Sequence, residues 1–133
     1  MITTRQFLET IFREVPEGQT PIVCLRDFVS RIPSEKDFNK IDAGKTQAYF
    51  CISTVQDNGD TQTAVRTREK TDCRQVHVLV LDDVGDADKV SQVAPIEPSY
   101  IIETSPGSFQ HGYIFKTPVT DLERFAVCVD ALG

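Results

Sequence analysis

Apolar residues recur at three- and four-residue steps near the start of the chain, which is the spacing of one face of an α-helix. They are Phe7, Leu8, Ile11, Phe12 and Val15. Thr4 is placed to cap the first turn, and Pro16 and Gly18 are residues that end helices. The pattern predicts an amphipathic helix over residues 4–15.

Two segments in the middle of the chain carry the β-branched and aromatic residues that are typical of strands. Residues 47–55 form the first, and the turn sequence Asp-Asn-Gly-Asp follows it. Residues 75–81 (QVHVLVL) form the second and are apolar with little alternation, which indicates a strand buried on both faces at the centre of a sheet. Between Pro21 and Pro33 the pattern is mixed, and its strand or helix identity stays open.

The last third of the chain predicts a hairpin and a closing helix. Residues 99–104 and 110–116 have strand patterns and are joined by a Ser-Pro-Gly-Ser turn. A short helix is predicted over 89–93, and residues 121–132 have apolar positions at helical spacing. We therefore expect one domain over the whole chain, of the α/β (α+β) class, with a small, mostly antiparallel sheet flanked by helices.

Composition limits the functions that this domain can have. The 133 residues carry a formal net charge of -6, so the chain as a whole repels nucleic acid, and any contact must use a local patch or a divalent metal. The four cysteines lack paired spacing and accompany only two histidines, which argues against a zinc site. No segment has a signal-peptide or membrane-span pattern. We expect a reduced, cytoplasmic protein with no membrane partner.

The acidic sequence at the end of the predicted central strand is the sharpest chemical feature. The strand leads into Asp82 and Asp83, and Asp86 follows. Hard cations such as Mg²⁺ take oxygen ligands and bind through one or two carboxylates plus substrate phosphates, so this placement suits a nucleotide-metal site. The alternative interpretation is an ordinary turn with solvated carboxylates.

The predicted hairpin turn is a second candidate site. It comprises Ser105, Pro106, Gly107 and Ser108, whose backbone N–H groups and hydroxyls are suited to a phosphate. Gln110 and His111 follow, and because successive strand residues point to opposite faces, only one of them can face a shared site. A plain hairpin with an edge histidine is the alternative.

A basic run precedes the acidic strand and is the third candidate. Arg66, Arg68, Lys70 and Arg74 lie within nine residues, and the first three would share one face of an extended segment. Such a row suits the phosphates of a nucleotide or a template. A solvated ribbon that protects a sheet edge is the alternative.

Taken in order, these segments resemble the archaeo-eukaryotic primase-polymerase superfamily, and most closely the RepB-like DNA primase domains of phages and plasmids. The resemblance runs from about residue 48 to 132 and rests on AYFCISTV, the basic run, HVLVLDDVGD, PSYIIETSPGSFQHGYIF and the closing helix. It implies an RRM-like fold and metal-dependent nucleotidyl transfer in DNA replication.

The resemblance also implies roles for individual residues. Asp82 and Asp83 would be catalytic and would hold Mg²⁺ or Mn²⁺, with Asp86 as a further possible ligand. The sequence TSPGSFQ would contact the nucleotide through Ser105, Gly107, Ser108 and Gln110. RepB-like members often carry glutamine where the wider superfamily has histidine, so Gln110 is the better match and His111 the second choice.

The chain departs from the family in two ways. The superfamily's acids are commonly separated by one residue, whereas here they are adjacent, which leaves open which of them ligate. Members also carry a further motif beyond the closing helix, and this chain ends at Gly133 before such a segment. We therefore expect either the first part of a longer primase or a short relative that has lost the chemistry.

Three hypotheses follow. The leading one is a primase-polymerase domain that binds a nucleoside triphosphate and a DNA template, with Arg66, Arg68 and Lys70 on phosphates and a helicase domain or replication protein as a partner. The second is a truncated, non-catalytic primase-like protein that acts on a replication or host partner through its acidic surface. The third is an α/β domain of unrelated role, because fold does not determine function.

Overall fold

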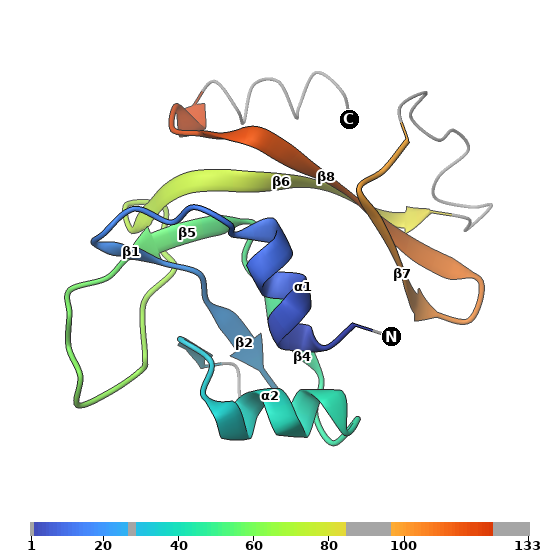
Figure 1. Ribbon diagram of the computed structural model, residues 1–133, viewed down its shortest axis with the longest axis horizontal. Coiled ribbons are helices and arrows are strands. Elements are labelled where there is room, and N and C mark those ends of the chain that lie inside the picture. The colour runs from blue at the N-terminus through green and yellow to red at the C-terminus, as the bar shows by residue number, and fades with distance from the viewer. Residues whose placement is uncertain (1, 27–28, 85–96, 124–133) are drawn as a thin grey trace.

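The computed structural model describes residues 2–26, 29–84 and 97–123, and of Asp83 and Val84 it describes the backbone alone (Figure 1). Within these ranges the chain forms two helices and two antiparallel sheets. The α+β class with an antiparallel sheet and flanking helices is therefore confirmed. Asp86, the predicted helix at 89–93 and most of the predicted helix at 121–132 lie outside the described residues, although Leu122 and Glu123 are helical.

The larger sheet has five strands in the order β1-β5-β6-β8-β7. Their bounds are β1 Gln19–Thr20, β5 Ser53–Gln56, β6 Cys73–Val84, β7 Tyr100–Ser105 and β8 Ser108–Val119. The smaller sheet has the order β3-β2-β4, with β2 Val23–Leu25, β3 Ser30–Arg31 and β4 Ala48–Phe50. The segment between Pro21 and Pro33, whose strand or helix identity the sequence left open, thus contributes two short strands to this second sheet.

The apolar run at 75–81 lies in the middle strand of the larger sheet, as predicted. The strand is longer than expected, however, because its pairing with β8 continues through a bulge to the pair Val84 and Phe109. Asp82 and Asp83 therefore belong to β6 itself and do not follow it. The predicted hairpin is confirmed, as β7 and β8 pair with Ser105 opposite Ser108.

Helix α1 spans Thr4–Ile11 and ends earlier than the predicted Val15. Its cap is Thr3 and not Thr4: the Thr3 hydroxyl accepts the Gln6 N–H, and the Gln6 side chain accepts the Thr3 N–H. Helix α2 spans Glu35–Asp42 and was not predicted. The same pair of reciprocal hydrogen bonds, between Ser34 and Asp37, caps its first turn. The three-residue spacing of Ser34 and Asp37 could have predicted this helix, whereas the hydrophobic pattern did not.

The predicted strand at 47–55 is divided between the two sheets. Its first half is β4, which pairs with β2, and its second half is β5, which pairs with β6. The chain therefore passes from the smaller to the larger sheet at Cys51 and Ile52. A single segment therefore belongs to both sheets, and several of its residues line the space between them.

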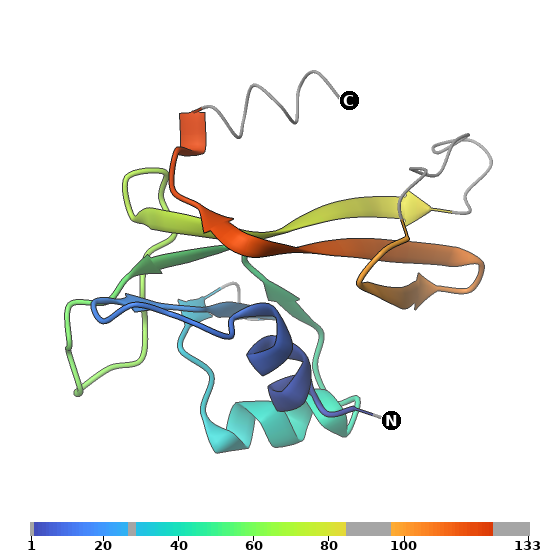
Figure 2. The same ribbon diagram turned by 45° about the horizontal axis from the view of Figure 1, so that its top comes forward.

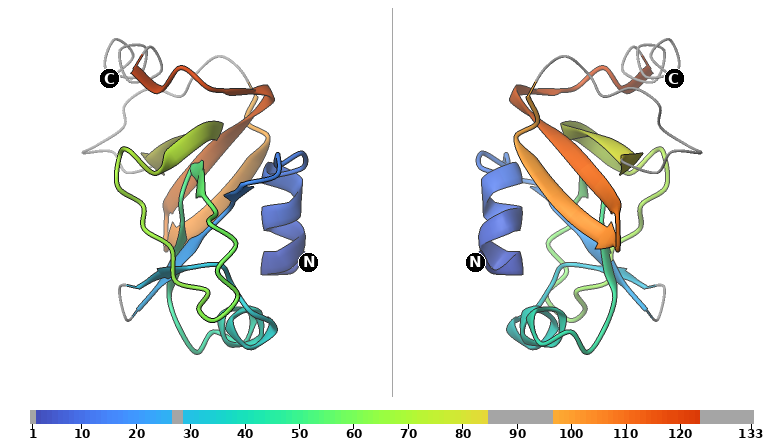
Figure 3. Two further views of the ribbon diagram at one scale, coloured as in Figure 1. Left: turned by 90° about the vertical axis from the view of Figure 1, so that its left-hand side faces the viewer. Right: turned by 90° about the vertical axis from the view of Figure 1, so that its right-hand side faces the viewer.

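The hydrophobic core lies between the larger sheet, α1 and the smaller sheet. Figures 1 and 2 show α1 against one face of the β6 and β8 ribbons, with the smaller sheet and α2 beyond it. Figure 3 shows that α1 stands on one side of the larger sheet. The buried core residues are Leu8, Ile11, Phe12, Val23, Leu25, Phe38 and Val78. No helix in the described ranges has the length and apolar character needed to cross a bilayer.

Candidate functional site

A cavity of about 610 Å³ lies between α1, the smaller sheet and the α1-facing side of the larger sheet. Its size falls in the range of sites for small molecules and cofactors. Most of its wall is apolar and includes Phe7, Tyr49 and Phe50. The polar lining residues are Thr4, Gln47, Asp82, Thr104 and Gln110. Such a wall suits a ligand with one apolar, ring-shaped part and one polar part.

The larger sheet brings Asp82, Thr104 and Gln110 together from three adjacent strands. Val80 lines the same cavity and lies opposite Gly112, so Asp82 and Gln110 continue this face two residues further along β6 and β8. On β7, Ile102 lies opposite Gln110, and Thr104 is two residues beyond it. The acidic motif and the hairpin motif therefore meet at one cavity.

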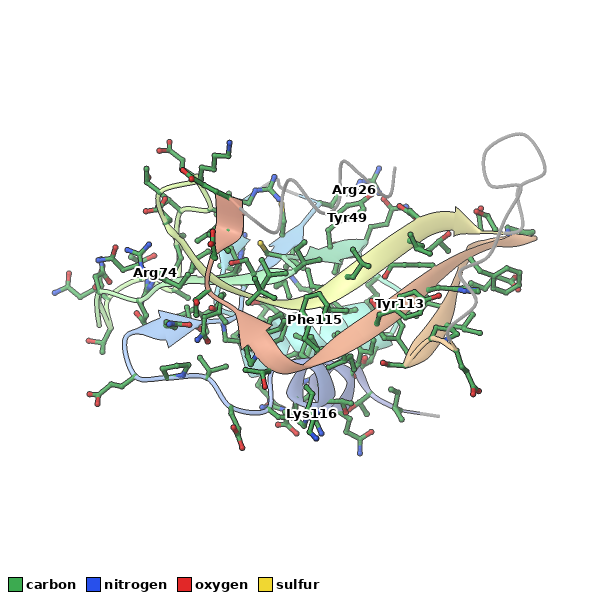
Figure 4. The ribbon with its side chains drawn as sticks, turned by 90° about the horizontal axis from the view of Figure 1, so that it is seen from above. Arg26, Tyr49, Arg74, Tyr113, Phe115 and Lys116 are labelled. Carbon is green, nitrogen blue, oxygen red and sulfur yellow. The ribbon has the colours of Figure 1, made fainter. Side chains whose placement is uncertain are left out.

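His111 lies on the opposite face of the sheet from Gln110. It is paired with Leu81 and is buried, with 9% of its surface exposed, and its Nδ1 has no hydrogen-bond partner among the described residues. Figure 4 looks onto this opposite face, where Tyr113 and Phe115 lie along β8. Of the two residues left open by the sequence, Gln110 is the one that lines the cavity.

Tyr100 supports Gln110 and was missed by sequence reasoning. Its hydroxyl donates to Gln110 Oε1 at 3.1 Å, and its ring meets Phe7 edge-on with centroids 4.8 Å apart. The ring covers Gly112, its partner across the strands, where a Cβ would come within 1.9 Å of Tyr100 Cε1. A glycine inside a predicted strand often marks a site where another group approaches the backbone closely. Gly112 could therefore have indicated from the sequence that a large side chain packs over it.

Among the described residues that line the cavity, Asp82 is the charged one. Burial raises the pKa of Tyr100 to about 12, and the negative charge of Asp82 adds to this increase, which places the carboxylate near the phenol. The phenol therefore stays protonated at neutral pH and remains a hydrogen-bond donor to Gln110. Among the described residues that line the cavity there is no lysine or arginine.

The oxygen atoms at the cavity are of the kind that bind the divalent cation which the family resemblance implies. Asp82 supplies an exposed carboxylate, and Thr104 supplies a neutral oxygen atom at the same cavity. Within the described residues no three His, Cys, Asp or Glu side chains gather as a metal site; the side chain of Asp83 and all of Asp86 lie outside them. The set fits Mg²⁺ or Mn²⁺ that takes further ligands from water and from phosphate oxygens, since Mg²⁺ commonly binds in this way.

The hairpin turn itself lies beyond the cavity wall. Gly107 has a φ of +79°, the left-handed conformation that favours glycine, and the turn residues Ser105 and Gly107 are exposed, while Ser108 is half-buried. The Thr104 hydroxyl donates to the Ser108 carbonyl oxygen at 3.3 Å. Thr104 was not among the predicted residues, yet it reaches the cavity because its side chain shares the face of Ile102 and Gln110.

Arg66 has a different environment from the one the basic run suggested. Only 7% of its surface is exposed, and all five N–H donors of its guanidinium are used within the loop around Asp57. Its ion pair with the Asp57 carboxylate, at 2.9 Å, holds this loop together. A guanidinium saturated in this way has no donor left for a phosphate, so we leave Arg66 out of the candidate site.

The rest of the basic run also lies away from the cavity. Arg68 and Lys70 are exposed, and neither of them lines the cavity. Arg74 donates to the Gln56 side chain and to the carbonyl oxygen of Thr71. The fold thus unites the acidic and hairpin motifs and separates them from the basic run.

Comparisons of the chain with protein families, with curated proteins and with solved structures return no match.

Proposed function

We propose that this chain is a primase-polymerase domain, with the RRM-like fold of that superfamily, that binds a nucleoside triphosphate with Mg²⁺ or Mn²⁺ and transfers the nucleotide to a primer on a DNA template. One observation carries the proposal. Asp82 and Gln110 come from two motifs that the family resemblance assigns to one nucleotide site, and both line the same cavity.

Different parts of the cavity wall suit the base and the phosphates of a nucleotide. The aromatic residues Phe7 and Phe50 offer surfaces for a base, and Asp82, Thr104 and Gln110 form a polar group from the larger sheet for the phosphates. A bound divalent cation would supply the charge neutralisation that this wall lacks and would polarise the transferred phosphoryl group. Ser105, Gly107 and Ser108, in the turn beyond Thr104, would contact the outer end of the triphosphate.

Tyr100 gives Gln110 a defined role in this arrangement. Because the phenol donates to Gln110 Oε1, the amide oxygen is engaged and the amide NH₂ group is the part left to donate to a phosphate oxygen. Asp82 would hold the cation, together with Asp83 in the role that the resemblance implies. A primer, a DNA template and a helicase domain or replication protein would be the macromolecular partners.

Binding measurements with matched variants test the proposal. We expect Mn²⁺-dependent binding of a nucleoside triphosphate, measured by calorimetry, to weaken by about tenfold or more in Asp82→Asn and in Gln110→Ala, equivalent to ~1.4 kcal/mol or more. Glu103→Gln is the control, because Glu103 is an exposed carboxylate on β7 at a position that alternates with Ile102 and Thr104. Equal affinities in wild type, Asp82→Asn and Gln110→Ala would refute the site.

A second function is favoured by one feature of the cavity. No lysine or arginine among the described residues lines it, which suits a primase-like protein that binds a ligand or a partner without transferring phosphate. Primer extension separates the two functions. Incorporation of nucleotides that Asp82→Asn abolishes supports the polymerase, whereas binding without extension supports the non-catalytic protein.

A further inference from the structure

A second, positively charged recess of about 290 Å³ lies where the end of α2 meets the ends of β2 and β3. We call it the basic recess and define it by Arg26, Arg31, Lys40, Lys45 and Thr46. Among the described residues that line it, Asp37 is the one acid, and the Asp37 carboxylate already accepts the Ser34 N–H at the start of α2. Among the described residues, four cations thus line one recess in a chain whose formal net charge is -6. Arg31 is engaged in an interaction of its own, which leaves Arg26, Lys40 and Lys45 as the cations that a ligand would meet.

The four cations come from separate parts of the fold. Lys40 lies in the last turn of α2, where a cation also stabilises the helix dipole, and Lys45 follows the helix end, tied by its N–H to the Lys40 carbonyl oxygen at 2.9 Å. Arg26 directly follows β2, and Arg31 lies on β3. Helix stability gives no reason for Arg26 to lie at the same recess as the two lysines. The convergence of Arg26, Lys40 and Lys45 instead forms a local site for an anion with several phosphates.

The basic recess and the cavity of the candidate site are lined by consecutive stretches of chain. Lys45 and Thr46 line the recess, and the next residues, 47–50, line the cavity. Tyr49, on β4, lies opposite Cys24 and is 61% exposed, and Arg26 is close by because Leu25 pairs with Ala48 (Figure 4). An exposed aromatic ring next to a basic recess is the combination that binds single strands, through stacking of a base and contacts to the backbone.

We infer that the basic recess binds backbone phosphates of a single-stranded nucleic acid and that Tyr49 stacks on an adjoining base. The direction of the strand, toward the cavity, rests on the proposed function, whereas the binding itself needs neither nucleotide nor metal. A duplex is disfavoured as the ligand because its bases are paired and stacked on one another and cannot lie on Tyr49. The strand is the natural template for the proposed reaction.

Fluorescence anisotropy with a labelled single-stranded oligonucleotide, in EDTA and without nucleotide, tests the inference. At 0.1 M salt we expect Lys40→Gln/Lys45→Gln to weaken binding by about 25-fold and to lower the salt slope by about 1.4, since each single-strand phosphate contact contributes about 0.7. Arg26→Gln should weaken binding independently. Tyr49→Ala should weaken binding of the single strand more than binding of a duplex of the same length.

The control is Arg68→Gln/Lys70→Gln, which removes the same charge from exposed cations outside the recess. Equal losses in the two double variants would overturn the inference, as would absence of single-strand binding by the wild type at 50 mM salt. The inference would also be overturned if the affinity for the oligonucleotide did not depend on its length and inorganic phosphate displaced it. The recess would then bind single phosphate ions and not a strand. Asp82→Asn should bind the strand like wild type, so failure of the nucleotide site and failure of the basic recess are distinguishable.

Discussion

Replacing Gly112 by alanine should destabilise the protein through the ring of Tyr100. A Cβ at residue 112 would lie 1.9 Å from Tyr100 Cε1 and 2.0 Å from Tyr100 Cζ, where ordinary contacts between carbon atoms are 3.5–4.0 Å. The ring must therefore move by more than an ångström. Movement on this scale breaks its edge-on contact with Phe7 and its hydrogen bond to Gln110.

The expected loss is about 2 kcal/mol of unfolding free energy. Overpacking of a filled site costs ~1–3 kcal/mol, and here the cost lies near the upper end, because it includes the loss of the aromatic pair and of the hydrogen bond, each worth ~1 kcal/mol. Against this, alanine restricts the unfolded chain more than glycine does, which stabilises by ~0.5–1 kcal/mol. Urea unfolding followed by circular dichroism measures the difference, and the midpoint should fall without a change in slope.

A double-mutant cycle identifies the ring as the cause. In a Tyr100→Ala background the methyl group at residue 112 has room, so Gly112→Ala should there be neutral or slightly stabilising. The coupling between the two substitutions should be about 2–3 kcal/mol, the loss in wild type plus any gain in the Tyr100→Ala background. If Gly112→Ala costs the same in both backgrounds, Tyr100 does not exclude the methyl group and the reasoning is wrong.

Three further predictions concern stability. The raised pKa of Tyr100, about 12, means that the stability held by its neutral phenol is complete below pH 10 and is lost as pH rises toward 12. Tyr100→Phe should therefore flatten the fall in unfolding free energy over that window, measured by urea unfolding. Arg66→Gln should cost about 2 kcal/mol in thermal unfolding because it leaves the carboxylate of Asp57 without its guanidinium partner, whereas the exposed Arg68→Gln should cost almost nothing. Ser34→Ala should cost about 1 kcal/mol by removing the cap of α2, and Ser34→Thr should restore most of it.

Local patterns in the sequence identified much of the fold. The first helix, the central strand and the hairpin follow from periods of 3.6 and 2 residues and from turn residues, which act over short stretches of chain. The same alternation showed that Gln110 and His111 could not share a site. The stop of α1 at Ile11, before the apolar Val15, shows the limit of periodicity: the backbone turns away at Phe12, where φ is -106° and ψ is 64°.

The candidate site depended more on contacts between distant segments. Nothing local distinguishes Arg66 from Arg68, yet Arg66 is buried because its loop folds back on Asp57 and its backbone N–H donates to the carbonyl oxygen of Ser30 on β3. Residues 47–55 form a continuous apolar and β-branched run, so their division between two sheets was not visible either. The basic recess likewise combines residues from the end of β2, from β3 and from α2, and Arg26 and Lys40 are 14 positions apart in the chain.

The amino-acid sequence by itself determined the type of most elements and the chemistry that two motifs offer, because both depend on neighbouring residues. The tertiary structure alone decided which motifs meet. Asp82 and Gln110 reach one cavity through the pairing of β6 with β8, and the basic run stays apart from it. Strand pairing and register are set by the whole core, in which residues far apart in the chain must fill one space together.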